Sequence, residues 1–427
     1  MKRFKYILRG IFAVILINLT TNVQAQISSR DFSSEISEEN ARVNESATAW
    51  LDSVDISLLT CGPGNEVWSY YGHTALLIED KAHYCDIVVN WGMFSFQQDY
   101  FILRFVFGLT DYQMGIVSMT DFMTEYAHEG RWVRQQLLLL SREEKLAIMR
   151  SIEKNYEPEN STYRYNFFYD NCTTRARNII LDNMEKGSVS LPKLSFSTTY
   201  RDEIHKWNAD HRWARFGNDL LLGYEADRRI DSKQYEFLPV NLSKDFDITS
   251  RTFVNKQEAP NMMKSVLVDS SFYLIPPQAA VAQPESITPF TVFLGLAVII
   301  LLLCGMEIYK KKNFWWMDAT LFILTGLPGL ILFTMIFSQH PTVQVNFQLL
   351  ILNPLNLFFV WKTSKKLKKG KIYWYYNVWG ALLLLSLFMQ IWQHYAEGIE
   401  ILALSLLFRY CVVSIRHDLS KRIKKWK

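Results

Sequence analysis

Cys172 is the residue of this sequence whose type and position point most directly to chemistry. It follows Asp170 and Asn171, two residue types that cap helices, and precedes a run with apolar residues at helical spacing. In the first turn of a helix, unpaired backbone N–H groups and the helix dipole stabilise a thiolate. The same N–H groups can hold an oxyanion when the thiolate attacks a carbonyl. Cys172 is therefore a candidate nucleophile, and a buried structural thiol is the alternative.

A base for this thiol is predicted on a hairpin of two strands between residues 68 and 92. A turn near residue 80 would place His73 opposite Val88. Because side chains on a strand alternate between two faces, Asp86 and Asn90 would then share the face of His73. Either polar side chain could hold the imidazole through Nδ1 while Nε2 faces the thiol, which is the logic of a Cys-His-Asn or Cys-His-Asp triad.

Four further residues are candidates for substrate binding. Tyr71 could donate into the oxyanion site or simply pack. Asn171 could contact substrate or only cap the helix. Arg175, about one turn from the cysteine, could hold a phosphate or lie on the solvated surface. His340, at the outer membrane boundary, could contact a lipid headgroup or belong to an ordinary polar loop.

The chain divides into an exported soluble part and a membrane part. Residues 1–25 have the basic start, the apolar stretch and the cleavage site with small residues that are typical of a signal peptide. Residues 26–274 are mixed and polar, which predicts an α+β periplasmic domain. Residues 275–288 are rich in Pro, Ala and Gln and predict a linker. Residues 289–427 predict an all-α transmembrane domain of about five helices.

The flanks of the apolar segments predict their orientation. The segments are Pro289–Tyr309, Phe314–Phe337, Val345–Trp361, Tyr373–Trp392 and Ile399–Ile415. Strongly basic loops belong in the cytoplasm, so the soluble domain and the loops around His340 and Glu397 are expected on the periplasmic side of the inner membrane. Two charges inside the segments, Asp318 and Arg409, both fall near cytoplasmic ends and could pair.

Composition excludes several classes of function. The formal net charge is only +4 and its positive excess lies in the cytoplasmic loops, so nothing indicates nucleic-acid binding. A Gly-rich phosphate loop, an HExxH motif and a paired CxxC motif are absent from the sequence, so no metal or cofactor is expected. Of the three external cysteines, Cys61 and Cys85 could form a disulfide, which would leave Cys172 free.

Several motifs support a resemblance to known families. The order HTALLIE, IVVNW and NCTTR is similar to the circularly permuted NlpC-type papain-like fold, which includes the lecithin:retinol acyltransferases. Aligning the strand ends with that group makes Asn90 the third triad member and Asp86 the reserve. The Glu-His-Phe often found after the cysteine in that group is replaced here by Thr173, Thr174 and Arg175.

More of the chain resembles a narrower family, the Lnb-type lipoprotein N-acyltransferases. The motifs are LLTCGPGNEVWSYYGHTAL, VVNWGMFSF, FVFGLTDYQM, YRYNFFYDNCTTRARNII, LLLGYEADRRI, EFLPVNL and FSQHPTVQVNFQLLILNPLNL. This resemblance implies that Cys172 takes an acyl chain from a membrane phospholipid as a thioester. The acceptor would be the α-amino group of the diacylglyceryl-cysteine of a lipoprotein.

Water must be excluded from such a transfer. Aromatic residues could line the site or belong to the core: Trp91, Phe94, Phe96, Tyr100, Phe101, Phe105 and Phe107. Two other interpretations stay open. One is a membrane-anchored NlpC-type cell-wall peptidase or amidase, which needs the same triad. The other is a non-catalytic envelope assembly protein, in which Cys172 is structural.

Overall fold

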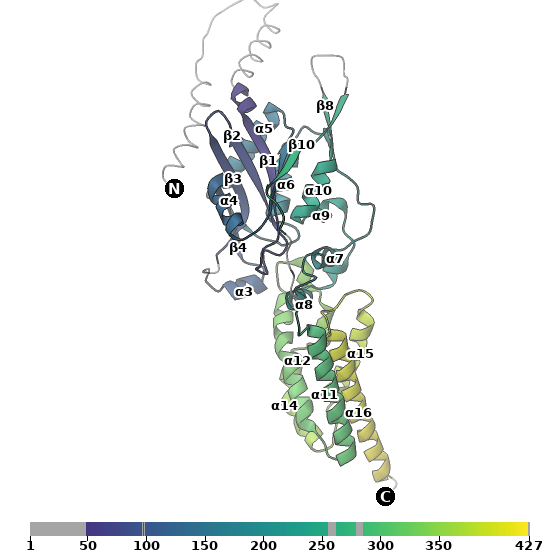
Figure 1. Ribbon diagram of the computed structural model, residues 1–427. Helices are drawn as coiled ribbons and strands as arrows, with labels where there is room; N and C mark the ends of the chain where they lie inside the picture. The colour runs from purple at the N-terminus through teal and green to yellow at the C-terminus, as the bar shows by residue number, and fades with distance from the viewer. Residues whose placement is uncertain (1–47, 96, 98, 255–261, 279–284, 426–427) are drawn as a thin grey trace, which may run out of the picture.

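The computed structural model describes residues 48–95, 97, 99–254, 262–278 and 285–425. An α+β domain forms the amino-terminal part and a bundle of long helices forms the carboxy-terminal part (Figure 1). The predicted signal peptide lies outside the described residues, as do Phe96 and a part of the predicted linker. The last strand of the first part, β10, ends at Ile275, and the first helix of the bundle, α11, begins at Pro289.

Seven antiparallel strands form the central sheet, in the order β10, β5, β1, β2, β3, β4, β6. They are β1 (Val54–Cys61), β2 (His73–Asp80), β3 (Cys85–Met93), β4 (Asp111–Ser118), β5 (Val133–Leu138), β6 (Thr162–Arg164) and β10 (Val268–Ile275). A smaller sheet contains β7 (Val189–Ser190), β8 (Ser250–Val254) and β9 (Met262–Val266). In β2, five consecutive residues are buried, as a central strand covered on both faces requires.

The predicted hairpin is the pair β2 and β3, but its register differs from the prediction. Ala75 pairs with Asn90, so the position opposite His73 moves from Val88 to Gly92. The cause is a longer turn, residues 81–84, which includes Tyr84 at a φ of 51°. The shift is an even number of residues and therefore keeps Asn90 on the face that was predicted.

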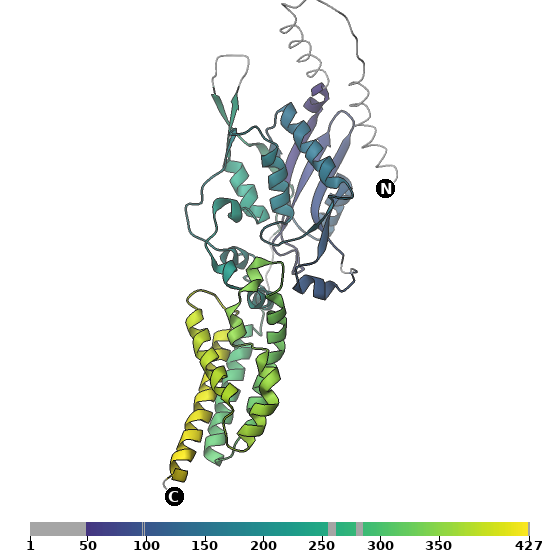
Figure 2. The ribbon, with the colours of Figure 1, turned by 180° about the vertical axis from the view of Figure 1, so that it is seen from behind.

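Helices cover both faces of the sheet (Figures 1 and 2). α5 (Arg142–Tyr156) and α6 (Cys172–Asp182) enclose one apolar core, which includes Trp91, whose Nε1 donates to Oδ1 of Asn155 at 2.8 Å. α4 (Met119–His128) packs against other side chains of the central strands and forms a second apolar core with them. The helix that carries Cys172 packs directly on β2 and β3. This arrangement is consistent with a papain-like fold.

Short helices complete the periplasmic domain. They are η1 (Ala49–Ser53), α3 (Phe101–Val106), α7 (Tyr200–His205), α8 (Arg212–Leu221), η2 (Tyr224–Asp227), α9 (Ser232–Tyr235) and α10 (Pro239–Ile248). Helices α7 and α8 lie next to the helical bundle (Figure 1), and the 3-10 helix η2 contacts α13 (Pro341–Gln344) of the bundle.

The bundle contains α11 (Pro289–Lys310), α12 (Trp315–Met335), α13 (Pro341–Gln344), η3 (Phe347–Leu350), α14 (Leu355–Lys368), α15 (Trp374–Met389) and α16 (Ile399–Lys425). Three stretches of the described chain are long and apolar enough to cross a membrane, residues 289–310, 315–335 and 341–368, and α15 is a shorter apolar helix. Five long helices are therefore present in the described part, and the chain is a multi-pass membrane protein with a periplasmic domain.

The third predicted segment differs in detail from the helix that was expected. Its long helix, α14, starts at Leu355 rather than at Val345. Pro354 explains the start, because proline lacks an N–H and disfavours helical backbone in the residue before it. The irregular backbone ahead of it is bonded to protein groups, for example from the N–H of Phe347 to Oε1 of Gln393 at 2.7 Å, as burial in a membrane domain requires.

The predicted pairing of two intramembrane charges is confirmed. Nε of Arg409 lies 3.0 Å from Oδ1 of Asp318, and Nη2 lies 2.6 Å from Oδ2. Nη1 donates to Glu307 at 2.6 Å, and Glu307 also accepts from Arg416 at 2.8 Å. The Tyr376 hydroxyl donates to Asp318 at 2.9 Å. We refer to these five residues as the Arg409 cluster.

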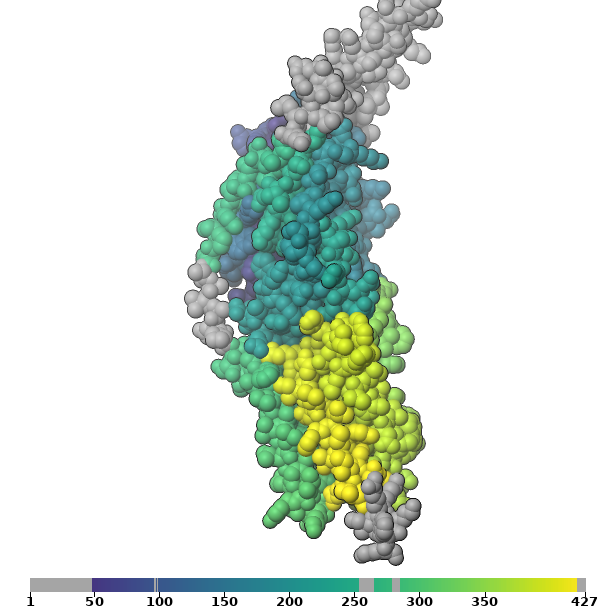
Figure 3. Space-filling model, turned by 90° about the vertical axis from the view of Figure 1, so that its right-hand side faces the viewer, coloured from purple at the N-terminus to yellow at the C-terminus, as the bar shows by residue number. Residues whose placement is uncertain are grey.

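The periplasmic domain is bonded to the outer end of the bundle. Two backbone N–H groups, those of Gly223 and Tyr224, donate to the carbonyls of Thr342 and Val345 at 2.8 and 2.7 Å. Nδ1 of His394 lies 3.1 Å from Oδ1 of Asp227. In Figure 3 the yellow carboxy-terminal helices meet the teal residues of the periplasmic domain directly. The two parts therefore form a joined structure rather than two domains on a flexible tether.

The disulfide that the sequence allowed between Cys61 and Cys85 is not formed. Cys61 pairs with His73 at one end of β2, whereas Cys85 pairs with Asp80 at the other end. Seven residues of extended strand separate these positions by about 23 Å, far more than the roughly 7 Å limit between the Cα atoms of a disulfide. All five cysteines are free.

Candidate active site

A capping box fixes the start of α6 and the position of Cys172. Oδ1 of Asn171 accepts from the N–H of Thr174 at 2.9 Å, and Oγ1 of Thr174 accepts from the N–H of Asn171 at 2.8 Å. These two bonds satisfy groups that a helix end otherwise leaves without partners. Cys172 follows as the first residue of the helix and is 7% exposed.

His73, the first residue of β2, lies beside this thiol and is held by Asn90 on β3. Nε2 of His73 is 3.0 Å from Oδ1 of Asn90. The imidazole is also within hydrogen-bonding reach of the Cys172 side chain. The orientation expected from sequence, with Nδ1 toward the polar residue and Nε2 toward the thiol, is therefore wrong. Because Asn90 takes Nε2, Nδ1 is the nitrogen left for the thiol.

The surroundings of Cys172 favour its thiolate. Burial is the largest single influence and raises the pKa of the thiol, whereas the charge of His73 and a hydrogen bond from its ring lower it. Bonds from the Thr74 backbone and the Thr173 hydroxyl add to this effect, and the pKa falls from 9.0 to about 7. Burial lowers the pKa of His73, whereas the thiolate and Asn90 raise it, with a rise as the result. Both shifts favour the pair of a thiolate and an imidazolium.

Four residues that were not predicted also belong to the surroundings of Cys172. Oγ1 of Thr74 lies 3.0 Å from Oγ1 of Thr173, which ties the start of β2 to the start of α6. The Tyr165 ring lies beside Cys172, and burial raises the pKa of its hydroxyl well above the usual range. Gly92, at a φ of 84°, lies between these two side chains: a Cβ there would be 3.2 Å from the Tyr165 ring and 3.8 Å from Cβ of Cys172.

The sequence contains signals for these residues. Each threonine directly follows a predicted catalytic residue, and Gly92 directly follows the strand run that contains Asn90. A glycine at the end of a strand often marks a close approach of another group to the backbone. Tyr165 has no comparable signal, because the six residues that separate it from the cysteine belong to neither a helix nor a strand.

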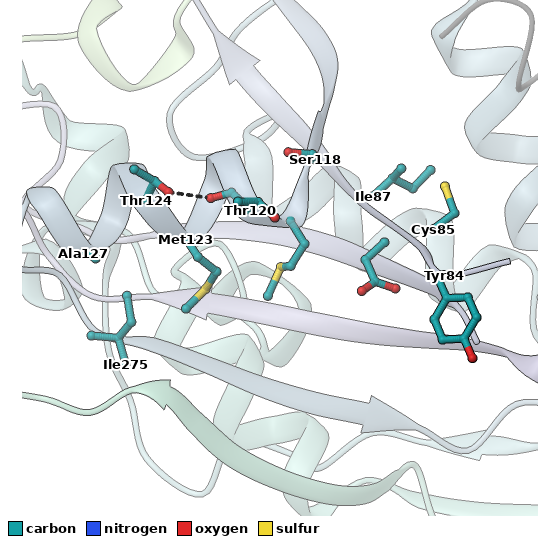
Figure 4. A pocket seen from close by; sticks show the side chains of 11 residues that line it. Tyr84, Cys85, Ile87, Ser118, Thr120, Met123, Thr124, Ala127 and Ile275 are labelled. Carbon is teal, nitrogen blue, oxygen red and sulfur yellow. Dashed lines mark hydrogen bonds between the residues drawn. The ribbon is translucent and has the colours of Figure 1, made fainter. Parts of the chain in front are cut away.

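Asp86, the reserve for the third position, lies elsewhere. It pairs with Glu79, four residues along β3 from Asn90, which corresponds to about 13 Å. It lines a surface pocket together with Tyr84, Met123 and Ile275 (Figure 4). Asp86 therefore has no contact with His73.

The two candidates Tyr71 and Asn171 are both used by structural hydrogen bonds. The Tyr71 hydroxyl accepts from Nδ2 of Asn208 at 3.2 Å and from Nδ2 of Asn218 at 2.5 Å. Nδ2 of Asn171 donates to the carbonyls of Phe167 and Phe237 at 2.8 and 2.9 Å. Tyr71 thus joins the loop before His73 to the segment around α8, and Asn171 anchors the loop before Cys172.

Arg175 forms a bidentate pair with Asp170, at 2.7 and 2.8 Å, and its guanidinium lies 3.4 Å from the centre of the Tyr163 ring. It is therefore not a free cation for a phosphate. His340 is buried beside the periplasmic domain, and its Nδ1 accepts from Nδ2 of Asn166 at 3.2 Å. Burial lowers the pKa of His340. The structure brings His340 to the loop before the cysteine, next to Phe167.

The arrangement has the parts that nucleophilic catalysis needs. It contains a thiol with a lowered pKa, a histidine that can accept and return a proton, an amide that orients the histidine, and a helix start that can hold an oxyanion. Among the described residues, no group of three or more His, Cys, Asp or Glu side chains is placed to bind a metal ion.

Comparison with known protein families identifies both halves of the chain. Residues 42–203 match the family model described as the Lnb N-terminal periplasmic domain, and residues 281–421 match the Lnb transmembrane domain. Together the matches cover more than two thirds of the 427 residues. No curated protein and no solved structure matches the chain. The two matches follow each other in chain order, the first within the periplasmic domain and the second over the helical bundle; the chain belongs to the Lnb family of lipoprotein N-acyltransferases, membrane proteins of lipoprotein processing.

Proposed function

We propose that this protein is a lipoprotein N-acyltransferase that works through a thioester on Cys172. The acyl donor is a membrane phospholipid, and the acceptor is the free α-amino group of a lipoprotein's diacylglyceryl-cysteine. The observation that carries the proposal is the lowered pKa of a buried thiol that faces His73, in a chain that matches the Lnb family over both halves.

In the first half-reaction, His73 holds the proton of the Cys172 thiol while the thiolate attacks an ester carbonyl of the phospholipid. The oxyanion that forms is stabilised by the N–H groups at the start of α6. Collapse of the intermediate breaks the ester C–O bond, and His73 returns the proton to the leaving glycerol oxygen. The products are an acyl thioester on Cys172 and a lysophospholipid.

In the second half-reaction, the amine of the lipoprotein attacks the thioester carbonyl. His73 accepts a proton from the nitrogen, and the C–S bond breaks to regenerate the thiolate, so that the product is an amide. Asn90 keeps the imidazole in place through both steps by its bond to Nε2. An amide is more stable than a thioester, which drives the transfer toward the triacylated lipoprotein.

A direct test is the mass of a lipoprotein amino-terminal peptide from cells in which this protein is the only candidate N-acyltransferase. With the unchanged protein we expect three acyl chains on the peptide, and with Cys172→Ser we expect two. Cys85→Ser serves as the matched control, because Cys85 lies at the far end of β2 from the site. Three chains with Cys172→Ser would contradict the proposal.

A peptidase would give a different result in the same cells. Cell-wall peptides, rather than the lipoprotein, would change in mass when Cys172 is replaced. The proposal predicts no such change.

A further inference from the structure

The short helix α3 lies at the membrane-facing end of the periplasmic domain, beside α12 (Figures 1 and 2). The carbonyl of Phe107, directly after α3, accepts from the N–H of Gln339 at 2.9 Å. Gln339 lies four residues beyond the end of α12, whose last residue is Met335. The bond therefore fixes α3 at the level where α12 leaves the bilayer.

The contact between these segments is close. Gly108 adopts a φ of 66°, and a Cβ at this position would lie 3.1 Å from the ring of His340 and 3.2 Å from the backbone nitrogen of Gln339. Backbone packs against backbone here, which leaves α3 little freedom to move away from the membrane surface.

The outer surface of α3 is apolar and exposed. Tyr100, Ile102 and Leu103 are 79%, 76% and 57% exposed. The charged residue of the helix, Arg104, is paired with Asp111. In water, exposed aliphatic side chains on adjacent positions are unfavourable by about 25 cal/mol for each Å² of apolar surface. A partner for this surface is therefore expected.

The continuity with α12 indicates which partner it is. Phe337, between the end of α12 and the bonded Gln339, is 66% exposed. Lipid-facing side chains of α12, such as Leu324 and Leu327, are exposed to a similar degree. The apolar surface of α3 thus lies at the end of a surface that the bilayer already covers.

A row of aromatic rings starts on α3 and continues toward Cys172. Ring centroids are 6.4 Å apart for Phe101 and Phe105, 6.0 Å for Phe105 and Phe167, and 5.2 Å for Phe167 and Tyr165. Tyr165 lies beside Cys172, since both side chains approach Gly92. We call these four rings the aromatic row.

We propose that α3 is embedded in the outer leaflet of the inner membrane, so that lipid acyl chains cover its apolar surface and contact the aromatic row. An interfacial helix of this kind buries its apolar side about 5–10 Å into the boundary between headgroups and chains. The embedding does not require acyl transfer, and it places hydrocarbon at the end of a path of rings that leads to Cys172.

Fluorescence quenching in liposomes tests the embedding. The full chain carries Ile102→Cys in a background where Cys85, Cys172 and Cys411 are replaced by serine, since the two other cysteines, Cys61 and Cys304, are buried. The cysteine is labelled with NBD, and the lipids carry a nitroxide at carbon 5 of an acyl chain. We expect strong quenching, several-fold above that of a label at Ile248→Cys.

Ile248 is the matched control because it is 67% exposed at the end of α10, next to β8 and far from the bundle (Figure 1). Equal quenching at both positions would overturn the proposal. A second outcome would also overturn the proposal. If lipid does not quench the label on α3, and the label becomes less exposed to water as the protein concentration rises, a second copy of the protein covers the helix.

Photo-crosslinking tests the contact with the aromatic row on the unchanged protein. The probe is a phosphatidylcholine with a diazirine in one acyl chain, and the labelled peptides are located by mass spectrometry. We expect labels in residues 100–107 and 165–169 as well as in the membrane helices. Labels confined to the membrane helices would overturn the proposal. Failure of the lipoprotein assay would leave both lipid experiments unaffected, so the two proposals can fail separately.

Discussion

Cys172 and Arg409 are both buried groups that carry charge, one in the periplasmic domain and one in the bundle. Three nitrogens of Arg409 are bonded to carboxylates, and those carboxylates are bonded in turn to Arg416 and Tyr376. Two positive and two negative residues make the Arg409 cluster neutral overall. Cys172 instead has a pKa lowered to about 7 and faces a histidine whose pKa is raised above its usual value.

The difference separates a structural site from a reactive one. Charges that are fully paired hold helices together and leave no group free to react. A thiol whose pKa is about 7 changes its charge state with little free energy, which is what a nucleophile in a two-step transfer must do. Substitutions in the two regions should therefore affect different quantities, activity in one and stability in the other.

The largest effect is expected from His73→Ala. Loss of the base should reduce acyl transfer by about 10²- to 10⁴-fold. The thiol pKa should rise, because burial raises it and the imidazole no longer opposes this. In the unchanged protein, alkylation of Cys172 should increase with pH around a midpoint of about 7. In the variant the midpoint should move above pH 9, which leaves under about 1% thiolate at pH 7.

Iodoacetamide labelling followed by peptide mass spectrometry at several pH values measures this midpoint. Labelling of Cys85 in the same samples is the internal reference, because that thiol lies at the other end of β2. An unchanged midpoint for Cys172 would mean that His73 does not control the pKa of the thiol. The distinction between a reactive site at Cys172 and a structural site at the Arg409 cluster would then not hold.

Arg409→Met should have an effect of similar size on stability. The substitution leaves Asp318 without its guanidinium partner in the bundle, and breaking a buried pair in this way costs about 3–5 kcal/mol. Thermal unfolding in detergent should shift downward, while the rate per folded molecule stays close to that of the unchanged protein. A stable but inactive variant would place the Arg409 cluster in the reaction rather than in the fold.

Asn90→Ala should have a smaller effect on catalysis. The imidazole loses the bond at Nε2, and a small displacement of a catalytic group can cost about 10²-fold in rate. Asp86→Ala is the matched variant on the same strand and should leave the rate unchanged. Steady-state assays with a diacylglyceryl peptide compare the two, and an equal loss in both would contradict the assignment of Asn90.

Gly92→Ala should have the smallest effect of the set. The φ of 84° is unfavourable for alanine by about 1–2 kcal/mol, and the added methyl group would contact the Tyr165 ring. We expect a loss of roughly tenfold in rate with a modest drop in unfolding temperature. An unchanged rate would mean that the added methyl group does not disturb the surroundings of Cys172.

The sequence was sufficient for the parts of the fold and site that depend on local pattern. A cap followed by helical periodicity marked the start of α6, and strand periodicity placed Asn90 on the face of His73. Local pattern could not predict which ring nitrogen of His73 faces the thiol, because this depends on the angle at which α6 packs against β2. The long turn at residues 81–84 likewise changed the register without changing the pattern.

Roles that depend on distant partners could not be predicted. Arg175 reads as a free cation near the cysteine, but Asp170 and the Tyr163 ring occupy it in the folded chain. The pairing of Asp318 with Arg409 was predictable, because a membrane span gives each charge few alternatives. In the periplasmic domain a charge has many possible partners, and only the tertiary structure selects among them.

The joint between the two halves has a consequence for biosynthesis. Asp219, Gly223 and Asp227 leave the ribosome before their partners, which include Gln348, at 2.9 Å from the Asp219 carbonyl oxygen, and His394. The surface of the exported domain that bonds to the bundle therefore cannot form all of its contacts until the later spans have been inserted. Full assembly of the protein is then coupled to translocon-mediated insertion of nearly the whole chain.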